Sequence, residues 1–220
     1  QKEEPPMTDT PSPSFDKDYL MGRFDPATHP DFVRIADRYA SRSGLYMRQE
    51  AYEAFKDMHE AAAAEGISLK ILSATRNFDY QKGLWEAKWT GARRLSDGVN
   101  AARDITDPAQ RALRILEYSA MPGASRHHWG TDIDLNALNN AYFRSGEGLR
   151  VFIWLEEHAS AHGFCRPYIE KGPQRPDGYN EEKWHWSYRP LAGPMLRAAK
   201  EKLRDEDIKG FQGAETAPEI

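Results

Sequence analysis

Two short clusters of potential metal ligands constrain this chain more than any other feature. The first is the stretch Ser125–Leu135, SRHHWGTDIDL, which carries His127 and Asp134. The second lies downstream and contains Glu182 and His185. Together they offer two imidazoles and a carboxylate for a metal ion, with a further carboxylate beside the last imidazole. A catalytic zinc site needs this inventory: three nitrogen or oxygen ligands, an open position for water, and a general base within reach.

Gly130 separates the two candidate ligands of the first cluster. A straight helix would keep His127 and Asp134 roughly 10 Å apart along its axis, and a straight strand would place them on opposite faces. Convergence on one ion therefore requires a bend, and Gly tolerates backbone angles that other residues avoid. The next residues, Thr131–Leu135, alternate polar and apolar side chains and predict a half-buried strand. Asp132 and Asp134 then face the same side, so spacing leaves open which of them is the ligand.

Length and composition favour one sizeable domain with tails. The chain has 220 residues, of which 40% are apolar and 11% aromatic, so a substantial core is expected. The net charge of −4 gives no electrostatic reason to expect a nucleic-acid partner. No continuous apolar run is long enough to predict a membrane span. Cys165 is the single cysteine, which excludes an internal disulfide and a cysteine-based zinc site.

The two ends of the chain are predicted to flank the domain. Residues 1–23 open with a segment rich in Pro, Ser and Thr and are expected to be flexible. Residues 24–209 are the predicted domain, and residues 210–220 a polar tail. The first residue is Gln1 rather than Met, which favours a processed, exported protein of the periplasm or cell envelope.

The apolar pattern along the chain predicts alternating helices and strands. Helices are expected at 48–65, after Thr75–Asn77, at 108–118 and at 149–162. Strands are expected at 67–74, 131–135 and 183–188, and the last of these places Trp184, Trp186 and Tyr188 on one side and His185 and Ser187 on the other. A further short helix is expected within 194–209. This order fits a single α+β domain with a small sheet.

Other candidate site residues have competing interpretations. Arg76 follows a predicted strand, where its guanidinium could be a solvated surface charge or could bind a carboxylate or carbonyl oxygen. His59 is followed by Glu but lacks a second His four residues on, so it is interpreted as helix surface. His158 and His162 lie one helical turn apart without a nearby carboxylate base, and they too are expected on a helix surface.

Three motifs resemble those of the VanY-type zinc D-alanyl-D-alanine carboxypeptidases, in the LAS family of peptidoglycan peptidases. Ser73–Gln81, SATRNFDYQ, resembles the pattern S-x-x-R-S-x-x-x-Q. Ser125–Asp134 resembles S-x-H-x-x-G-x-A-x-D, and Glu182–His185 resembles E-x-W-H. The motifs occur in the family's order and span residues 73–185, about half of the chain.

The resemblance implies a zinc enzyme that removes the terminal D-alanine from peptidoglycan stem peptides. Zinc would lower the pKa of its water towards about 7, and Glu182 would accept the proton as that water attacks the peptide carbonyl. The implied zinc ligands are His127, Asp134 and His185. The residues implied to contact or position the substrate are Arg76, Ser125 and Gln81. The implied fold is a small antiparallel sheet flanked by helices.

Two positions depart from the family pattern. Asn77 replaces a Ser, which is interpreted as a change of helix cap, and Asp132 replaces a small residue. Asp132 could orient a metal ligand or be a surface acid, and the sequence leaves both open.

Alternative functions remain within and outside the family. An L,D-carboxypeptidase or a stem-peptide endopeptidase would use the same motifs, because the pocket for the leaving residue decides between them. A non-catalytic, zinc-stabilised cell-wall binding module would need neither Glu182 nor Arg76, so their presence favours catalysis.

Overall fold

Four short strands form the central sheet of the computed structural model, which describes residues 15–220. Their order across the sheet is β3 (Ile71–Ser73), β4 (Asp132–Leu135), β6 (His185–Tyr188) and β5 (Phe164–Cys165). A separate two-stranded sheet pairs β1 (Phe32–Arg34) with β2 (Tyr46–Arg48). All of these pairings are antiparallel. The predicted α+β fold with a small antiparallel sheet is confirmed.

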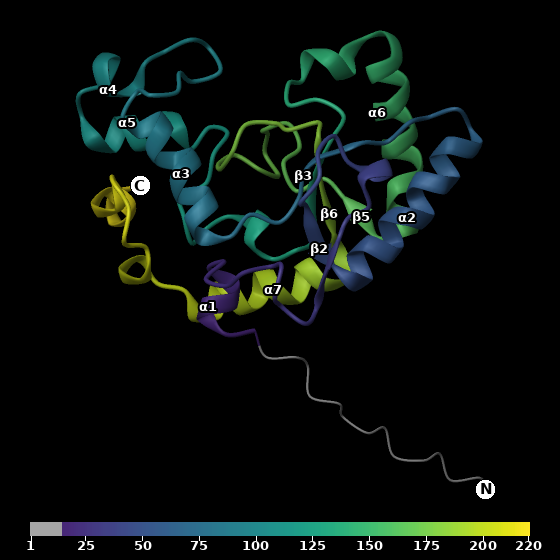
Figure 1. The fold of residues 1–220 in the computed structure, drawn as a ribbon. Helices are drawn as coiled ribbons and strands as arrows, with labels where there is room; N and C mark the ends of the chain where they lie inside the picture. The colour runs from purple at the N-terminus through teal and green to yellow at the C-terminus, as the bar shows by residue number, and fades with distance from the viewer. Residues whose placement is uncertain (1–14) are drawn as a thin grey trace, which may run out of the picture.

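Helices surround the central sheet (Figure 1). Figure 1 shows α2 (Gln49–Ala64) and α6 (Gly146–His158) on one side, with α3 (Phe78–Trp89), α4 (Ala101–Asp104) and α5 (Pro108–Ile115) gathered on the other. The short α1 (Lys17–Leu20) packs against α7 (Arg189–Lys202). Short 3₁₀ helices are η1 (Asp37–Tyr39), η2 (Arg126–His128), η3 (Ala141–Arg144), η4 (Ala159–His162), η5 (Asp205–Asp207) and η6 (Ala214–Glu219). Within residues 15–220, no helix combines the length and apolar character that a membrane crossing would require.

Alternation along the central strands separates the core from the polar face. Ile133 and Trp186 are buried in the main core, together with Phe55 of α2 and Trp154 of α6. Asp132 and Asp134 on β4, and His185 and Ser187 on β6, are polar and face the other side of the sheet. They do so because successive side chains on a strand point to opposite faces. The predicted alternation of residues 183–188 therefore holds, and the polar face of the sheet is available for a site.

A second core lies beneath the helices on the far side of the sheet. Trp85 and Trp89 of α3 pack with Ile115 of α5 and with Phe211 near the C-terminus. Trp85 is fully buried, and its Nε1 donates to the carbonyl oxygen of Gln212 at 2.8 Å. Residues 210–220, expected as a polar tail, pack against α3 through Phe211.

The packed part of the chain also reaches beyond the N-terminal boundary expected at residue 24. Residues 1–14 lie outside the described part of the chain, but α1 begins at Lys17. Tyr19 and Leu20 are buried in a third core with Met195 of α7, and Tyr19 Oη donates to the carbonyl oxygen of Trp129 at 2.6 Å. The domain therefore includes residues 15–23, which pack against the segment that leads into β4.

Local capping explains where several helices begin. Asn77 Oδ1 accepts a hydrogen bond from Tyr80 N at 2.9 Å, so Asn77 caps α3 as expected. Pro108 occupies the first turn of α5, where its missing N–H costs nothing. The helix expected within 194–209 instead begins at Arg189, with Pro190 in its first turn and Pro194 inside it. β1 and β2 were not predicted, since three residues are too few for a recognisable alternation.

Candidate metal centre

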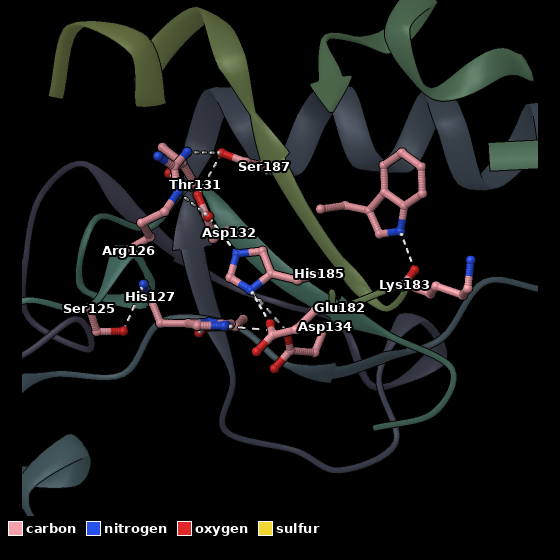
Figure 2. Close-up of polar contacts among 12 residues, drawn as sticks. Ser125, Arg126, His127, Thr131, Asp132, Asp134, Glu182, Lys183, His185 and Ser187 are labelled. Atoms are coloured by element: carbon pink, nitrogen blue, oxygen red, sulfur yellow. Dashed lines mark hydrogen bonds and ion pairs between the residues drawn. The ribbon is translucent and has the colours of Figure 1, made fainter. Parts of the chain in front are cut away.

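His127, Asp134 and His185 converge on the polar face of the sheet (Figure 2). One ligand atom from each lies within 4.8 Å of the others, and all three side chains are buried. They come from η2, β4 and β6 respectively. Asp134 lies directly opposite His185 in the strand register, which brings these two side chains together. Within residues 15–220 this is the one group of three or more His, Cys, Asp or Glu that could hold a metal ion.

The loop before β4 delivers His127 to this group. Ser125 caps η2, because its Oγ accepts from His127 N at 3.1 Å. Gly130 then turns the chain with a φ of +81°, and a Cβ there would lie 2.5 Å from the ring of Phe32. Both the backbone angle and the lack of space require Gly at this position. The bend expected between His127 and Asp134 is present at Gly130.

Hydrogen bonds fix which nitrogen of each imidazole faces the group. His127 Nδ1 lies 2.8 Å from the carbonyl oxygen of Ala74 and donates to it, which leaves Nε2 facing Asp134 Oδ1 at 3.3 Å. His185 Nε2 lies 2.6 Å from Asp132 Oδ2, which leaves Nδ1 facing Asp134 Oδ1 at 3.6 Å. Figure 2 shows the His185 ring held between these two carboxylates. The two rings therefore present different nitrogens to the same point.

The protonation states suit a divalent cation. Burial lowers the pKa of His127 and Arg76 lowers it further, so this ring is neutral. Burial raises the pKa of Asp134, but His127 and His185 outweigh that effect and lower it overall. Asp134 Oδ1 is buried and makes no hydrogen bond. A neutral imidazole nitrogen and an unpaired buried carboxylate oxygen are ligand forms for zinc, so the residues present fit this metal.

His185 is the ligand candidate whose proton a metal would displace. Burial alone would lower the pKa of His185, but hydrogen bonds to Asp132 and Glu182 raise it to about 9. With the site free of metal, both ring nitrogens therefore carry protons at neutral pH. The Nε2 proton remains on the Asp132 side when a cation takes the place of the Nδ1 proton.

Asp132 lies outside the group of His127, Asp134 and His185, on the Nε2 side of the His185 ring. Its fully buried carboxylate accepts from His185 Nε2, from Arg126 Nε at 3.0 Å, and from the hydroxyls of Thr131 and Ser187 at 2.7 Å each. Burial raises the pKa of Asp132, but Arg126 and His185 outweigh it and hold the pKa far below its usual range. Asp132 is therefore a permanent carboxylate that holds the His185 ring and its Nε2 proton in place.

Glu182 is the remaining carboxylate beside the ligand group. It is buried just before β6, and its Oε2 lies 3.2 Å from His185 Nδ1. Its backbone N–H donates to the carbonyl oxygen of Tyr168 at 2.9 Å, which anchors the segment. A carboxylate at this position could act as a general base for water on a metal held by the three neighbouring side chains.

A cavity of about 660 Å³ opens over the ligand group and collects the other predicted site residues. Arg76, Gln81 and Ser125 all line it. Arg76 N donates to the carbonyl oxygen of His127 at 2.9 Å, while its buried Nε has no partner. Gln81 Nε2 donates to the carbonyl oxygen of Ala120 at 2.9 Å, and its buried Oε1 is unpaired. Two polar groups in the cavity wall therefore have unused hydrogen-bonding capacity.

Three residues with structural roles at the site were not predicted. His128 Nδ1 donates to the carbonyl oxygen of Arg76 at 2.6 Å, and its Nε2 accepts from Gly123 N at 3.0 Å. Burial lowers the pKa of His128 to about 3, so it is a neutral bridge rather than a ligand. Tyr168 packs its ring edge-on against His185 at 4.8 Å between centroids, and Tyr179 packs on Tyr168. Neither Tyr belongs to a regular pattern, because both lie in irregular loop segments.

Comparison with known proteins gives a family match. A family model described as VanY, D-alanyl-D-alanine carboxypeptidase, matches residues 44–191. A Bacillus subtilis (strain 168) protein named as the carboxypeptidase YodJ is 28% identical over 171 residues, which are 74% of this chain and 51% of that protein. The chain spans about half the length of the curated relatives it matches.

Solved structures share the fold. The structure of VanYB in complex with D-Ala-D-Ala superposes with a TM-score of 0.56 at 21% identity, over 83% of this chain and 90% of that one. A zinc complex of a variant of the vancomycin resistance D,D-pentapeptidase VanY, from the VanB-type cassette, gives a TM-score of 0.53 at 22% identity, over 80% of this chain and 94% of that one. At these identities the comparisons establish a common architecture.

Proposed function

This chain belongs to the VanY family of D-alanyl-D-alanine carboxypeptidases, and we propose that it is a zinc peptidase that removes the terminal D-alanine from peptidoglycan stem peptides. The observation that carries this proposal is the convergence of His127, Asp134 and His185 within 4.8 Å, with Glu182 beside them. The substrate lies in the cell envelope, so we propose that the protein is exported and acts there. The D-Ala-D-Ala and zinc complexes of proteins with the same fold support both the substrate class and the metal.

The zinc would be held by His127 Nε2, a carboxylate oxygen of Asp134 and His185 Nδ1. A zinc ion there supplies Lewis acidity, which makes a bound water more acidic and polarises the carbonyl of the scissile bond. Asp132 keeps His185 Nε2 protonated, so that only Nδ1 is free to act as a ligand.

Glu182 carries the proton in this proposal. Its carboxylate accepts a proton from the attacking water as the new C–O bond forms, then donates it to the amine nitrogen as the C–N bond breaks. The products are a shortened peptide with a new carboxylate and free D-alanine. Glu182 Oε2 lies 3.2 Å from His185 Nδ1. This carboxylate is therefore next to the ligand group but is not one of its members.

Arg76 and Gln81 position the peptide. The guanidinium of Arg76 lines the cavity beside the ligands and binds the carbonyl oxygen that gains charge, or the terminal carboxylate. The unpaired Oε1 of Gln81 accepts an N–H from the peptide. Ser125 contributes by capping η2 and thereby fixing His127.

Mass spectrometry of purified muropeptides tests the reaction. Pentapeptide and tetrapeptide substrates are incubated with zinc-loaded protein and, as a control, with chelator-treated protein. We expect loss of one alanine from the pentapeptide, abolished by the chelator. Loss of alanine from the tetrapeptide alone would assign an L,D-carboxypeptidase, and cleavage inside the stem an endopeptidase. No cleavage of either substrate by zinc-loaded protein would contradict the proposal and favour a binding module.

A further inference from the structure

The cavity over the metal centre is lined by an excess of positive charge. Its acidic lining residues are Asp134 and Glu182, both at the metal centre. Besides Arg126, which pairs with Asp132, six cationic side chains line the same cavity: Arg42, Arg76, Lys88, Arg93, Arg94 and Arg144. Lys88, Arg93 and Arg94 lie close together in the sequence, and the fold brings Arg42, Arg76 and Arg144 to the same cavity from other segments.

None of these six cations forms an ion pair with a carboxylate of residues 15–220. Arg94 Nη1 donates to the carbonyl oxygen of Gly98 at 2.9 Å, and Arg42 Nη2 donates to Tyr80 Oη at 3.3 Å. Both partners are neutral. Many other exposed cations of the chain are paired, including Lys17, Arg103 and Arg150. These six side chains therefore remain available to bind an anion from outside the protein.

Lys88 on α3 is the most informative of the six. Its half-buried ammonium donates to Ser119 Oγ, a neutral partner. Burial, and after it the nearby charges of Arg93 and Arg76, lower the pKa of Lys88 to about 8 against the opposing effect of Glu182. Arg93 and Arg76 therefore lie close enough to Lys88 for their charges to repel its ammonium. A bound anion would relieve this repulsion.

The charge of the catalytic components does not balance this excess. A zinc ion in the ligand group would offset the charges of Asp134 and Glu182. The terminal carboxylate and the free α-carboxylate of a γ-linked D-Glu would then offset only two of the six remaining cations. Clefts lined by one sign of charge attract and orient ligands of the opposite sign. The cavity is therefore complementary to a peptide that carries carboxylates besides its terminal one.

We propose that Lys88 and Arg93 form an anion subsite that binds a side-chain carboxylate of the substrate peptide, separate from the group bound by Arg76. This inference rests on the proposed function and names the substrate class of the same site. Stem peptides differ in whether their third residue carries the side-chain carboxylate that this subsite would bind. The third residue can be meso-diaminopimelate, whose side chain ends in an amine and a free carboxylate, or lysine, which lacks that carboxylate. The subsite selects the diaminopimelate form.

Two synthetic pentapeptides that differ only in this carboxylate provide the test: L-Ala-γ-D-Glu-X-D-Ala-D-Ala with X either meso-diaminopimelate or L-lysine. We expect kcat/KM of the wild-type zinc enzyme to be about fivefold or more in favour of the diaminopimelate peptide. The ratio should fall towards one in Lys88→Met and Arg93→Gln, and furthest in the double variant. Lys82→Met is the matched control, because Lys82 lies on the same helix, is 40% exposed, pairs with Glu86 at 3.8 Å and does not line the cavity.

Direct binding separates failure of the subsite from failure of the proposed function. Both peptides are titrated into the Glu182→Gln protein by calorimetry, with thermal melting to show that each variant is folded. Equal cleavage of the two peptides by the wild type, or a ratio that survives in the double variant, overturns the subsite and leaves the peptidase proposal standing. Tighter binding of the diaminopimelate peptide, lost in the folded Lys88→Met/Arg93→Gln/Glu182→Gln protein, supports the subsite even if the wild type cleaves neither. No measurable binding or cleavage of either peptide would overturn both.

Discussion

Asp132 and Asp134 show how neighbouring identical residues acquire different roles. Both face the polar side of β4, yet Asp132 is surrounded by donors and the Oδ1 atom of Asp134 has no hydrogen-bond partner. Arg126 and Ser187 supply the donors for Asp132, and Ser187 lies directly opposite it in the strand register. A carboxylate that already has four donors is poorly suited to bind a cation, whereas Asp134 is free to do so.

Asp132→Asn tests its role in positioning His185. The amide cannot accept from Arg126, Thr131 and His185 together, so the His185 ring loses its fixed orientation. We expect zinc affinity to fall about 10- to 100-fold, measured by competition with a chromophoric chelator. Arg126→Met is the control that removes one donor and keeps the carboxylate. Unchanged affinity in Asp132→Asn would show that His185 is oriented by other contacts.

The state of Lys88 predicts a pH dependence for substrate preference. Because the pKa of Lys88 is lowered to about 8, its positive charge is present below that pH and is lost as the pH rises through it. The groups that face it are Arg76, Arg93, Glu182 and Ser119. We expect the preference for the diaminopimelate pentapeptide to fall as the pH rises, with a midpoint at or below about pH 8, since a bound dication lowers the pKa of Lys88 further. A preference that stays constant from pH 6.5 to pH 9.5, followed as the ratio of kcat/KM values, would contradict this.

At the scale of elements, the turn at Gly130 joins the two halves of the ligand group. Gly130→Ala must place a Cβ 2.5 Å from Phe32 and 2.7 Å from Arg48 Cγ, in addition to adopting a positive φ. Gly66→Ala shares the positive φ, +75°, but its Cβ would meet nothing within 4 Å. We expect Gly66→Ala to cost about 1 to 2 kcal/mol of unfolding free energy, and Gly130→Ala to cost more and to weaken zinc binding. Equal losses of unfolding free energy for the two variants in denaturant titrations would contradict this, because they would mean that Phe32 and Arg48 move aside without destabilising the protein.

The elements around the site could be predicted to different degrees. β4 and β6 could be predicted because their apolar side chains alternate against a buried core, and this alternation also put His185 and Ser187 on the correct face. Residue spacing alone could not choose between Asp132 and Asp134, because a strand puts both on one side. That choice depends on Arg126 and Ser187, whose proximity is a property of the tertiary fold. The motif resemblance selected Asp134, and the ligand group contains it.

At the scale of the whole molecule, residues 15–23 and 210–220, at the two ends of the described part of the chain, pack on the domain that holds the site. Sequence composition suggested a flexible start and a polar tail, because isolated apolar residues such as Tyr19 and Phe211 form no periodic pattern. In the structure Tyr19 donates a hydrogen bond to the carbonyl oxygen of Trp129, two residues after His127. Phe211 packs on Trp85 of α3. The helix that carries Gln81 and Lys88 is therefore supported from behind by the C-terminal segment.

Truncation after residue 209 tests this support. It removes Phe211 from the second core and takes away the acceptor of Trp85 Nε1. We expect a loss of about 3 kcal/mol or more, since burial of a large aromatic side chain has this magnitude, and a lower melting temperature by calorimetry. Phe211→Leu in the full chain is the milder control. A truncated protein as stable as the full chain would restore the interpretation of a polar tail.

The central claim is that His127, Asp134 and His185 hold zinc while Glu182 moves the proton. Zinc content by elemental analysis and turnover of the D-Ala-D-Ala pentapeptide, measured on the same preparations of wild type, Glu182→Gln and His185→Ala, test it directly. We expect about one zinc per chain in wild type and in Glu182→Gln, with turnover reduced about 10²- to 10⁴-fold in Glu182→Gln, and both zinc and turnover lost in His185→Ala. A Glu182→Gln protein that keeps its turnover, or a His185→Ala protein that keeps its zinc, would contradict the account.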